Sequence, residues 1–284
     1  MQLNEQQAQS QTCLDYAESG EKRQDLQLQL DHIYNMDCLE GMKQIPDGTI
    51  DAVICDLPYG VLNKGSEGGS WDAVIPFEPL WEQYRRVCKP NAAIVLFAQG
   101  MFTADLMQSN RKMWRYNLVW NKMRATGFLN CARMPLRQHE DICVFYDKLP
   151  TYNPQKYKVP DWAKTHTRGR GASNTNRCYG SYGLHQKFDI TNEKWPMSII
   201  EISKKANEPD AWHPTQKPVD LLRYLVLTYT NPGMVVLDNC MGSGTTAIAC
   251  LKEHRHFLGF ELNKKYYDKA VQRIERERQQ LTLF

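Results

Sequence analysis

A glycine-rich turn between an apolar run and a helix constrains the fold of this chain more than any other feature. Residues 235–237 are apolar, and residues 242–247 fit the pattern G-x-G-x-x-A. Glycines let the backbone approach a ligand closely, and the start of a helix offers unpaired N–H groups. The next apolar run, 256–260, ends at Glu261, whose carboxylate can accept hydrogen bonds from ribose hydroxyls. The segment therefore predicts a nucleotide-like ligand on a strand–turn–helix unit.

Two other interpretations of this turn stay open at this point. An ordinary tight turn uses the same glycines, and an NAD site has a similar pattern. A phosphate loop does not fit, because no Lys follows Gly244 in the position that G-K-[ST] requires. One further strand–helix unit follows the turn, so the other strands of the sheet must come from before it. This position predicts a circularly permuted sheet.

Apolar runs and helical spacings alternate along most of the chain. The runs that predict strands are 52–55, 92–98, 117–120, 142–146, 234–237 and 256–260. The segments with helical spacing are 77–88, 219–229, 245–252 and 264–278, the last of which is rich in charges and predicts a solvated helix. This alternation is typical of an α/β fold with a Rossmann-like, doubly wound sheet.

Composition divides the chain into four parts. Residues 1–30 hold eight glutamines and a net charge of −3, as expected for a mobile tail. Residues 31–150 and 208–284 carry the periodic segments. Between them, residues 151–207 lose periodicity and contain ten Lys or Arg against four Asp or Glu, a net charge of +6. A module that binds a polyanion has this charge, and so does a solvated surface insertion.

The remaining composition indicates a cytoplasmic protein. Hydrophobic residues make up 42% of the chain, which is enough for a sizeable core, yet no apolar run approaches the roughly 20 residues that cross a bilayer. The first residues have neither the basic nor the apolar region of a secretory signal. Nine cysteines without a C-x-x-C pair favour free thiols over disulfides or a metal centre. His139-Glu140 does not suggest zinc either, because H-E-x-x-H is absent.

A second turn, Asp56-Leu57-Pro58-Tyr59, follows directly on the apolar run 52–55. Active sites of open α/β sheets lie at the carboxyl ends of strands. Pro58 keeps Leu57 out of the helical region, so the Leu57 carbonyl is held in an extended turn. A carboxylate and a carbonyl side by side can accept both N–H bonds of an exocyclic amine and expose its lone pair for attack on a methyl group. An Asp-capped turn has the same residues, so this turn alone does not decide the chemistry.

A third segment, His213-Pro214-Thr215-Gln216-Lys217-Pro218, precedes the glycine turn by one helix. With the order of the other two turns and the basic block, it makes the chain resemble the beta-ordered group of S-adenosylmethionine-dependent DNA amino-methyltransferases, which act at adenine N6 or cytosine N4. The resemblance covers about residues 31–270. It implies that 31–150 is the catalytic half, 151–207 the target-recognition insertion and 208–284 the cofactor-binding half.

The resemblance also implies roles for individual residues. The catalytic turn would be Asp56, Leu57, Pro58 and Tyr59, with Tyr59 stacking on a base flipped out of the duplex. S-adenosylmethionine would be bound by Asp37, Cys38, His213, Thr215, Lys217, Asp238, Asn239, Met241, Gly242, Ser243, Gly244, Thr245 and Glu261. Within this set, Asp37 would take the cofactor's adenine amino group, while Thr215 and Lys217 would hold its carboxylate. Double-stranded DNA would be contacted by Lys122, Arg124, Arg168, Arg170 and Arg177.

Two positions depart from the family's usual pattern. Leu57 stands where the family usually has Pro, but the acceptor is a backbone carbonyl, so the chemistry should survive. Asn239-Cys240-Met241 replaces a more usual Phe beside the cofactor, which affects the packing there. The segment from Trp120 to Ile142 resembles the hairpin that flanks the flipped base.

Several functions remain to be separated. The resemblance favours methylation of adenine N6 in a bacterial or phage-type, DNA-associated enzyme, with cytosine N4 as the alternative. A methyltransferase of RNA or of a protein glutamine would share the catalytic turn. A DNA-binding protein without catalysis would not need Asp56, and a nicotinamide oxidoreductase leaves the Asp-Leu-Pro-Tyr turn unexplained. The sequence leaves open a homodimer and a cognate restriction nuclease as partners.

Overall fold

The structure is a computed structural model, which describes residues 28–61, 72–160, 175–176, 180–181, 192–203 and 215–281. The predicted tail 1–30 lies outside these residues except for its last three. Four predicted site residues also lie outside them, namely Arg168, Arg170, Arg177 and His213.

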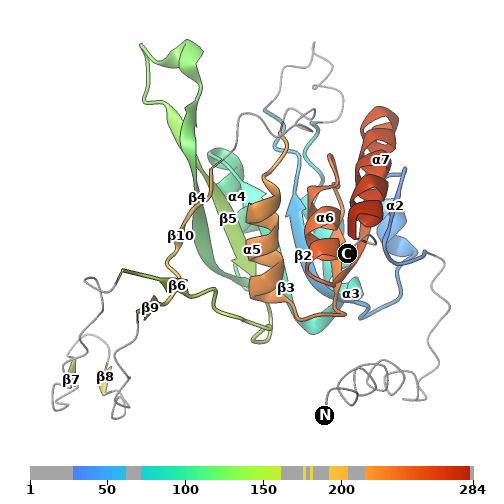
Figure 1. The fold of residues 1–284 in the computed structure, drawn as a ribbon, viewed down its shortest axis with the longest axis horizontal. Coiled ribbons are helices and arrows are strands. Elements are labelled where there is room, and N and C mark those ends of the chain that lie inside the picture. Colours follow the sequence, from blue (N-terminus) through green and yellow to red (C-terminus); the bar gives the residue numbers. More distant parts are fainter. Residues whose placement is uncertain are drawn as a thin grey trace.

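Within the described residues, eight strands form one sheet in the order β1-β12-β11-β2-β3-β5-β4-β10 (Figure 1). Neighbouring strands are parallel except at β5, which is antiparallel to both β3 and β4. The strand bounds are β1 His32–Tyr34, β2 Ile50–Asp56, β3 Cys88–Ala98, β4 Trp114–Thr126, β5 Arg137–Phe145, β10 Ile199–Glu201, β11 Val235–Asp238 and β12 His256–Phe260. The predicted mixed α/β class, with a mostly parallel sheet, is confirmed.

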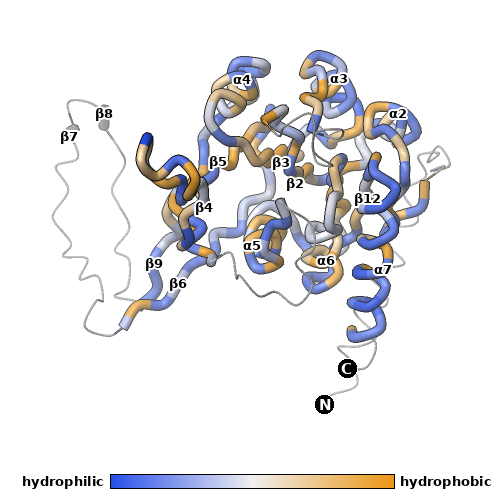
Figure 2. Tube along the Cα trace, turned by 90° about the horizontal axis from the view of Figure 1, so that it is seen from above, coloured by the Kyte–Doolittle hydropathy of each residue, from blue (hydrophilic) through white to orange (hydrophobic). Residues whose placement is uncertain are grey.

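Helices cover both faces of the sheet (Figure 2). One face carries α2 (Cys38–Lys43), α3 (Phe77–Val87) and α4 (Met101–Ser109), and the other carries α5 (Val219–Tyr229), α6 (Thr245–Lys252) and α7 (Lys264–Leu281). Among the described residues, no helix is both long and apolar enough to cross a membrane.

The central strands have continuous apolar stretches, 52–55 in β2 and 92–98 in β3, because both of their faces are buried there. Ile54 and Val95 belong to the apolar layer beneath α5 and α6. Their neighbours Val53 and Ile94 belong to the layer beneath α3 and α4. Period-two alternation therefore divides each strand between two cores, which fixes the register of the sheet and places the strand ends at a common edge.

Two predicted strands are longer than their apolar runs. The runs 117–120 and 142–146 correspond to β4 and β5, which extend by several polar and exposed residues into a hairpin that rises above the sheet (Figure 1). At its tip lies a short 3₁₀ helix, Phe128–Asn130. Hydrophobicity marks the part of a strand that is buried, so a projecting hairpin escapes that signal.

A strand near the end of the basic block belongs to the main sheet. β10 pairs with β4 through Ile199, Ile200 and Glu201. Elsewhere in the block lie two small antiparallel pairs, formed by β6 (Tyr157–Lys158) with β9 (Glu193–Lys194) and by β7 (Thr175–Asn176) with β8 (Gly180–Ser181).

The last helix, predicted to be solvated, is mostly exposed but has one buried face. Ala270, Arg273 and Ile274 of α7 are buried, because they pack against the start of α6 and the glycine turn.

Candidate active site

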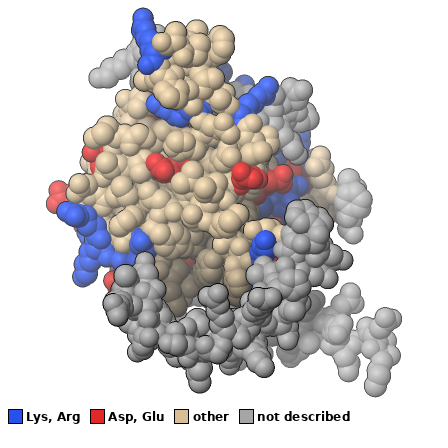
Figure 3. Space-filling view, turned by 90° about the vertical axis from the view of Figure 1, so that its left-hand side faces the viewer, with Lys and Arg blue, Asp and Glu red and all other residues tan. Residues whose placement is uncertain are grey.

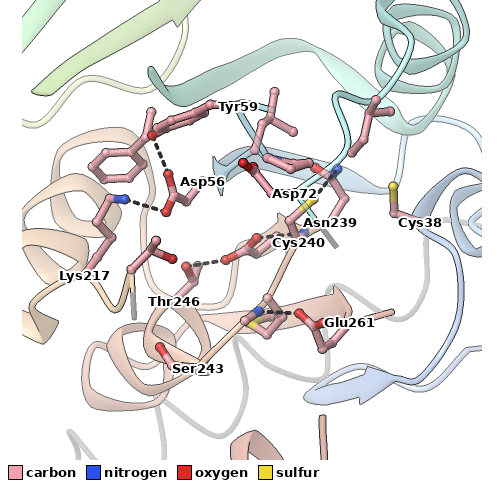
Figure 4. A pocket seen from close by; sticks show the side chains of 18 of the residues that line it. Cys38, Asp56, Tyr59, Asp72, Lys217, Asn239, Cys240, Ser243, Thr246 and Glu261 are labelled. Carbon is pink, nitrogen blue, oxygen red and sulfur yellow. Dashed lines mark hydrogen bonds and ion pairs between the residues drawn. The ribbon is translucent and has the colours of Figure 1, made fainter. Parts of the chain in front are cut away.

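A cavity of about 500 Å³ opens at the carboxyl ends of β2, β11 and β12. The two predicted turns meet in it, with Asp56, Leu57, Pro58 and Tyr59 on one side and residues 238–243 with Thr245 on the other (Figure 4). The segment 36–39, the segment 215–217 and Glu261 complete much of the lining. Residues more than 200 positions apart in the sequence thus share one pocket, as a doubly wound sheet dictates.

Asp238 organises the glycine turn from within. Its Oδ1 accepts from the Cys240 backbone N–H at 3.1 Å, and its Oδ2 accepts from the Thr246 hydroxyl at 2.6 Å. Burial raises the pKa of Asp238 to about 6, and these donors oppose that rise. Both carboxylate oxygens are therefore engaged in holding the turn against the first turn of α6.

Two side chains outside the turn anchor it. The Tyr84 hydroxyl of α3 donates to Asn239 Oδ1 at 2.5 Å. Arg273 of α7 donates to the Ser243 carbonyl and to Thr245 Oγ1, both at 3.0 Å. Tyr84 and Arg273 were not predicted from the sequence, because the only signal for either is a polar side chain at a core-facing helix position. Met241, in the place of the family's usual aromatic residue, is buried and lines the cavity.

Glu261 lies where the sequence predicted, at the end of β12 and on the cavity wall. Its two oxygens accept from the Gly242 and Asn263 backbone N–H groups, each at 2.8 Å. Burial raises the pKa of Glu261, and these two donors oppose it. Because the carboxylate is held by backbone donors, its orientation toward the cavity is fixed before any ligand arrives.

The segment predicted to meet the cofactor's adenine reaches the same cavity. Met36, Asp37, Cys38 and Leu39 all line it. Asp37 also has a structural task, because its Oδ1 caps α2 by accepting from the Leu39 and Glu40 N–H groups at 2.9 and 3.1 Å.

The structure corrects the reason for Gly244. A Cβ at this position would not enter the cavity but would meet Ile274 Cδ1 at 3.2 Å and Ala270 Cβ at 3.4 Å. Gly244 also has φ +76°, a conformation that side chains with a Cβ disfavour. The residue is thus required by the backbone turn and by the packing of α7.

Asp56 is held on both sides. The Tyr59 hydroxyl donates to Asp56 Oδ1 at 2.6 Å, and Lys217 Nζ donates to Asp56 Oδ2 (Figure 4). Burial raises the pKa of Asp56, with Lys217 opposing the rise and Glu140 adding to it. Burial would lower the pKa of Lys217, but Asp56 and Glu140 hold it above its ordinary value. The Lys217 ammonium thus lies directly beside the Asp56 carboxyl group at the cavity wall.

The ion pair continues into the β4–β5 hairpin. Lys217 Nζ lies 3.3 Å from Glu140 Oε2, and Glu140 Oε1 lies 3.3 Å from Lys122 Nζ. Burial alone would raise the pKa of Glu140, but the two ammonium groups hold it below its ordinary value. Carboxylates and ammonium groups alternate along this chain, so each charge has an opposite neighbour.

Two predicted site residues lie in this network. Lys217, expected to hold the cofactor's carboxylate, is paired with Asp56. Lys122, expected to contact DNA, is 3% exposed and lines the cavity. Glu140 was considered in the sequence only as part of a zinc motif, which is absent. The register of β4 with β5, which places Glu140 opposite Trp120, is not readable from local spacing.

The remaining predicted residues divide between the cavity and the surface. Thr215 lines the cavity, and the Tyr59 ring packs on Phe102 with 5.0 Å between the ring centroids. Arg124 is exposed on the hairpin. Asp72, which was not predicted, is buried at the cavity wall and accepts from the Gly60 N–H at 3.0 Å.

A family model for N6 and N4 methyltransferases, described as DNA methylase, matches residues 50–272. The chain belongs to this DNA methylase family. The match spans the Asp-Leu-Pro-Tyr turn, the hairpin, the segment 215–218 and the glycine turn. The predicted N6/N4 DNA methylase family is thereby confirmed.

Individual proteins resemble this DNA methylase over most of its length. It is 27% identical over 250 residues to the type II methyltransferase M.HpaI of Haemophilus parainfluenzae, which covers 84% of the chain and 72% of M.HpaI. Two solved structures share the fold. The M1.HpyAVI–SAM complex has a TM-score of 0.55 at 23% identity, covering 85% of this chain and 98% of M1.HpyAVI. The cytosine-N4-specific PvuII DNA methyltransferase has a TM-score of 0.59 at 15% identity, covering 84% of each chain.

Proposed function

We propose that this DNA methylase transfers a methyl group from S-adenosylmethionine to the exocyclic amine of a base flipped out of double-stranded DNA, with adenine N6 as the target. The observation that carries the proposal is a single cavity shared by the Asp56-Leu57-Pro58-Tyr59 turn and the glycine turn. One turn supplies acceptors for an amine. The other supplies a carboxylate and helix-start N–H groups of the kind that bind a nucleoside.

The acceptors address the poor nucleophilicity of the amine, whose lone pair is delocalised into the ring. The Asp56 carboxylate and the Leu57 carbonyl accept its two N–H bonds and draw the nitrogen toward a tetrahedral form. The lone pair would then attack the methyl carbon in line as the bond between that carbon and its sulfur breaks, and the extra proton of the methylated amine would pass to the Asp56 carboxylate. The gain in rate comes from positioning and from preorganised charge.

Lys217 keeps Asp56 ready for this task. An adjacent ammonium favours the ionised carboxylate, which is the form that accepts a hydrogen bond. Asp56 Oδ2 accepts from Lys217, and a carboxylate oxygen can accept a second hydrogen bond, so an arriving amine can bind beside the ammonium. Glu140, 3.3 Å from the same Nζ, gives Lys217 a second carboxylate partner.

The residues around the glycine turn suit S-adenosylmethionine, which supplies an electrophilic methyl group when bound. Glu261 presents a carboxylate oriented by two backbone donors, as ribose hydroxyls require. Met36, Leu39 and Met241 offer apolar surface for the cofactor's purine. Asp37, Cys38 and Thr215 complete this part of the wall, whereas Asp238, Asn239, Ser243 and Thr245 chiefly hold the turn in shape.

We further propose the domain organisation that the sequence suggests. Strands from 31–150 and from 208–284 pair directly, β2 with β11 and β1 with β12, so the two halves share one sheet. The glycine turn lies in the C-terminal half but at the centre of the sheet, which supports a circularly permuted order. Residues 151–207 would read the DNA sequence, since they carry the net charge of +6.

Cytosine N4 satisfies the same acceptor geometry as adenine N6. An RNA base or a protein glutamine would use it as well, although neither accounts for the basic block.

Cells that express the chain provide the test, because sequencing of their DNA with modified bases identified reports both the base and its sequence context. N6-methyladenine at one motif is expected. N4-methylcytosine would change the assigned base, and unmodified DNA would contradict the proposal.

The role of Asp56 is tested with purified protein. Asp56→Ala should slow methyl transfer by at least about 100-fold, the scale for removing one preorganised polar group from an active site. Affinity for S-adenosylmethionine, measured by calorimetry, should stay close to wild type. Glu82→Gln on the exposed side of α3 is the matched control, since it removes one carboxylate far from the cavity. Near wild-type turnover in Asp56→Ala would reject the assignment.

A further inference from the structure

The hairpin between β4 and β5 carries an exposed apolar tip. Every residue from 123 to 139 is exposed. Phe128 is 76% and Leu129 98% exposed, and Met123, Met134 and Leu136 also present much of their surface to solvent. A cluster of large, exposed apolar side chains on a projecting element usually marks a surface that binds a partner.

The tip is built to hold a shape. Gly127 has φ +88°, which reverses the chain at the end of β4. The N–H groups of Asn130 and Cys131 then donate to Gly127 O and Phe128 O at 2.9 and 3.0 Å, closing successive tight turns. Phe128 and Leu129 are thus carried on an ordered turn instead of being buried by it.

Charge favours a polyanion as the partner. Residues 121–139 contain four Lys or Arg and no Asp or Glu. Three of these, Arg124, Arg133 and Arg137, are exposed, while Lys122 lies in the cavity. In Figure 3 the projecting part at the top of the molecule is mostly uncharged surface edged by Lys and Arg. A protein partner would need neither this sign of charge nor the absence of acids.

The same hairpin forms a wall of the cavity. Lys122, Thr126 and Glu140, at its base, line the pocket into which the Asp-Leu-Pro-Tyr turn opens. Arg137 donates to Gln99 Oε1 at 2.8 Å, and Gln99 donates to the His139 carbonyl at 3.1 Å, which ties the hairpin to the end of β3. The hairpin that carries the tip therefore borders the cavity.

From these observations, and resting on the proposed function, we infer that Phe128 and Leu129 enter the DNA duplex at the step from which the target base leaves. They fill the gap in the stack, while Arg124 and Arg133 contact flanking phosphates. Apolar side chains can be inserted between base steps in this way, and extruding a base costs unstacking and unpairing energy. The wedge lowers the cost of opening the duplex. It contributes nothing to methyl transfer once the base is in the cavity.

The test uses the full chain and two duplexes that carry the recognition motif found by sequencing. In one duplex the target base is paired; in the other it lies opposite an abasic site, so less energy is needed to extrude it. The F128A/L129A variant should methylate the paired duplex about tenfold more slowly or worse, and the abasic-opposed duplex nearly as fast as wild type. Leu149→Ala, an exposed leucine beyond the opposite end of β5, should match wild type on both duplexes.

Other outcomes overturn the inference. Equal rates for variant and wild type, or equal losses on both duplexes, exclude a wedge that opens the pair. A change in sedimentation would instead identify the tip as a contact between two copies of the chain. A second variant, R124Q/R133Q, keeps the apolar tip and should lower the slope of log affinity against log salt by about 0.9 for each phosphate contact; an unchanged slope contradicts the assigned phosphate contacts. If wild type methylates neither duplex, the proposed function itself fails.

Discussion

Lys217 and Asp56 form an ion pair at the floor of the cavity, although 161 positions separate them in the sequence. Lys217 comes from the segment that precedes α5, and Asp56 ends β2. The pairing ties the His-Pro-Thr-x-Lys-Pro segment to the catalytic turn. In the sequence analysis that segment was expected to serve the cofactor alone.

Removing the ammonium should therefore change the pH dependence of methyl transfer. In Lys217→Met the buried Asp56 loses its positive neighbour, so its pKa rises and a higher pH is needed to ionise it. The acid limb of the pH–rate profile is expected to move upward by about one to three pH units, the range for loss of an adjacent opposite charge. Activity at neutral pH falls and recovers partly as the pH is raised.

Two measurements separate this role from cofactor binding. Lys217→Arg keeps the charge and should bring the acid limb back toward its wild-type position. Affinity of Lys217→Met for S-adenosylmethionine, by calorimetry, should stay near wild type. A large loss of that affinity with an unmoved acid limb would return Lys217 to the role of holding the cofactor's carboxylate.

Gly244 should matter for stability more than for ligand binding. Gly244→Ala is expected to lower the free energy of unfolding by about 1–2 kcal/mol for the left-handed conformation, with more from the contact with Ile274. Gly233 is the matched control, because it has φ +78° but nothing within 4 Å of its Cβ position. Denaturant unfolding of both variants measures the difference. Ile274→Val, which removes the closest atom, should recover part of it; loss of cofactor affinity at unchanged stability would contradict this account.

Site residues could be predicted where neighbouring residues in the sequence mark their position, and could not be predicted where long-range packing places them. The Asp56 turn and the glycine turn lie at strand ends, where adjacent residues reveal their position, and both reached the cavity as predicted. Glu140 and Arg273 are isolated polar residues whose importance comes from register and helix packing, which link distant segments. Lys122 looked like a surface base because its burial depends on a hairpin that hydrophobic patterning does not reveal.

Because of Asp238, the free energy of unfolding should decrease as the pH rises. Its pKa is about 6 in the folded protein and near its ordinary value of 3.8 in the unfolded chain, so the native state favours the protonated form. The favourable contribution of Asp238 to the free energy of unfolding is fully present below about pH 4 and is lost as the pH rises through 6. The loss is at most about 3 kcal/mol at 1.36 kcal/mol per pKa unit.

Asp238→Asn keeps the shape of the side chain without the charge. Relative to wild type, the variant should therefore gain free energy of unfolding between about pH 4 and 7, as the wild-type carboxyl ionises. Urea unfolding at several pH values measures this difference, in which the contributions of Asp56 and Glu261 cancel. A difference between variant and wild type that stays constant with pH would show that Asp238 does not titrate in this range.

The basic block supplies the last prediction. Arg168 and Arg170 lie in residues 151–207, whose net charge is +6. Phosphate contacts release counterions and base-edge contacts discriminate by about 1–3 kcal/mol each, so R168A/R170A should weaken DNA binding or relax its site preference. Affinity for S-adenosylmethionine should not change.

R111A/K112A, which removes two exposed charges after α4, controls for the loss of positive charge alone. Filter binding at two salt concentrations, on specific and scrambled duplexes, distinguishes the cases. If R168A/R170A matches wild type in all four measurements, these arginines do not recognise DNA. If R168A/R170A loses only as much affinity as the control on both duplexes, the two arginines contribute only to the overall positive electrostatic potential of the protein.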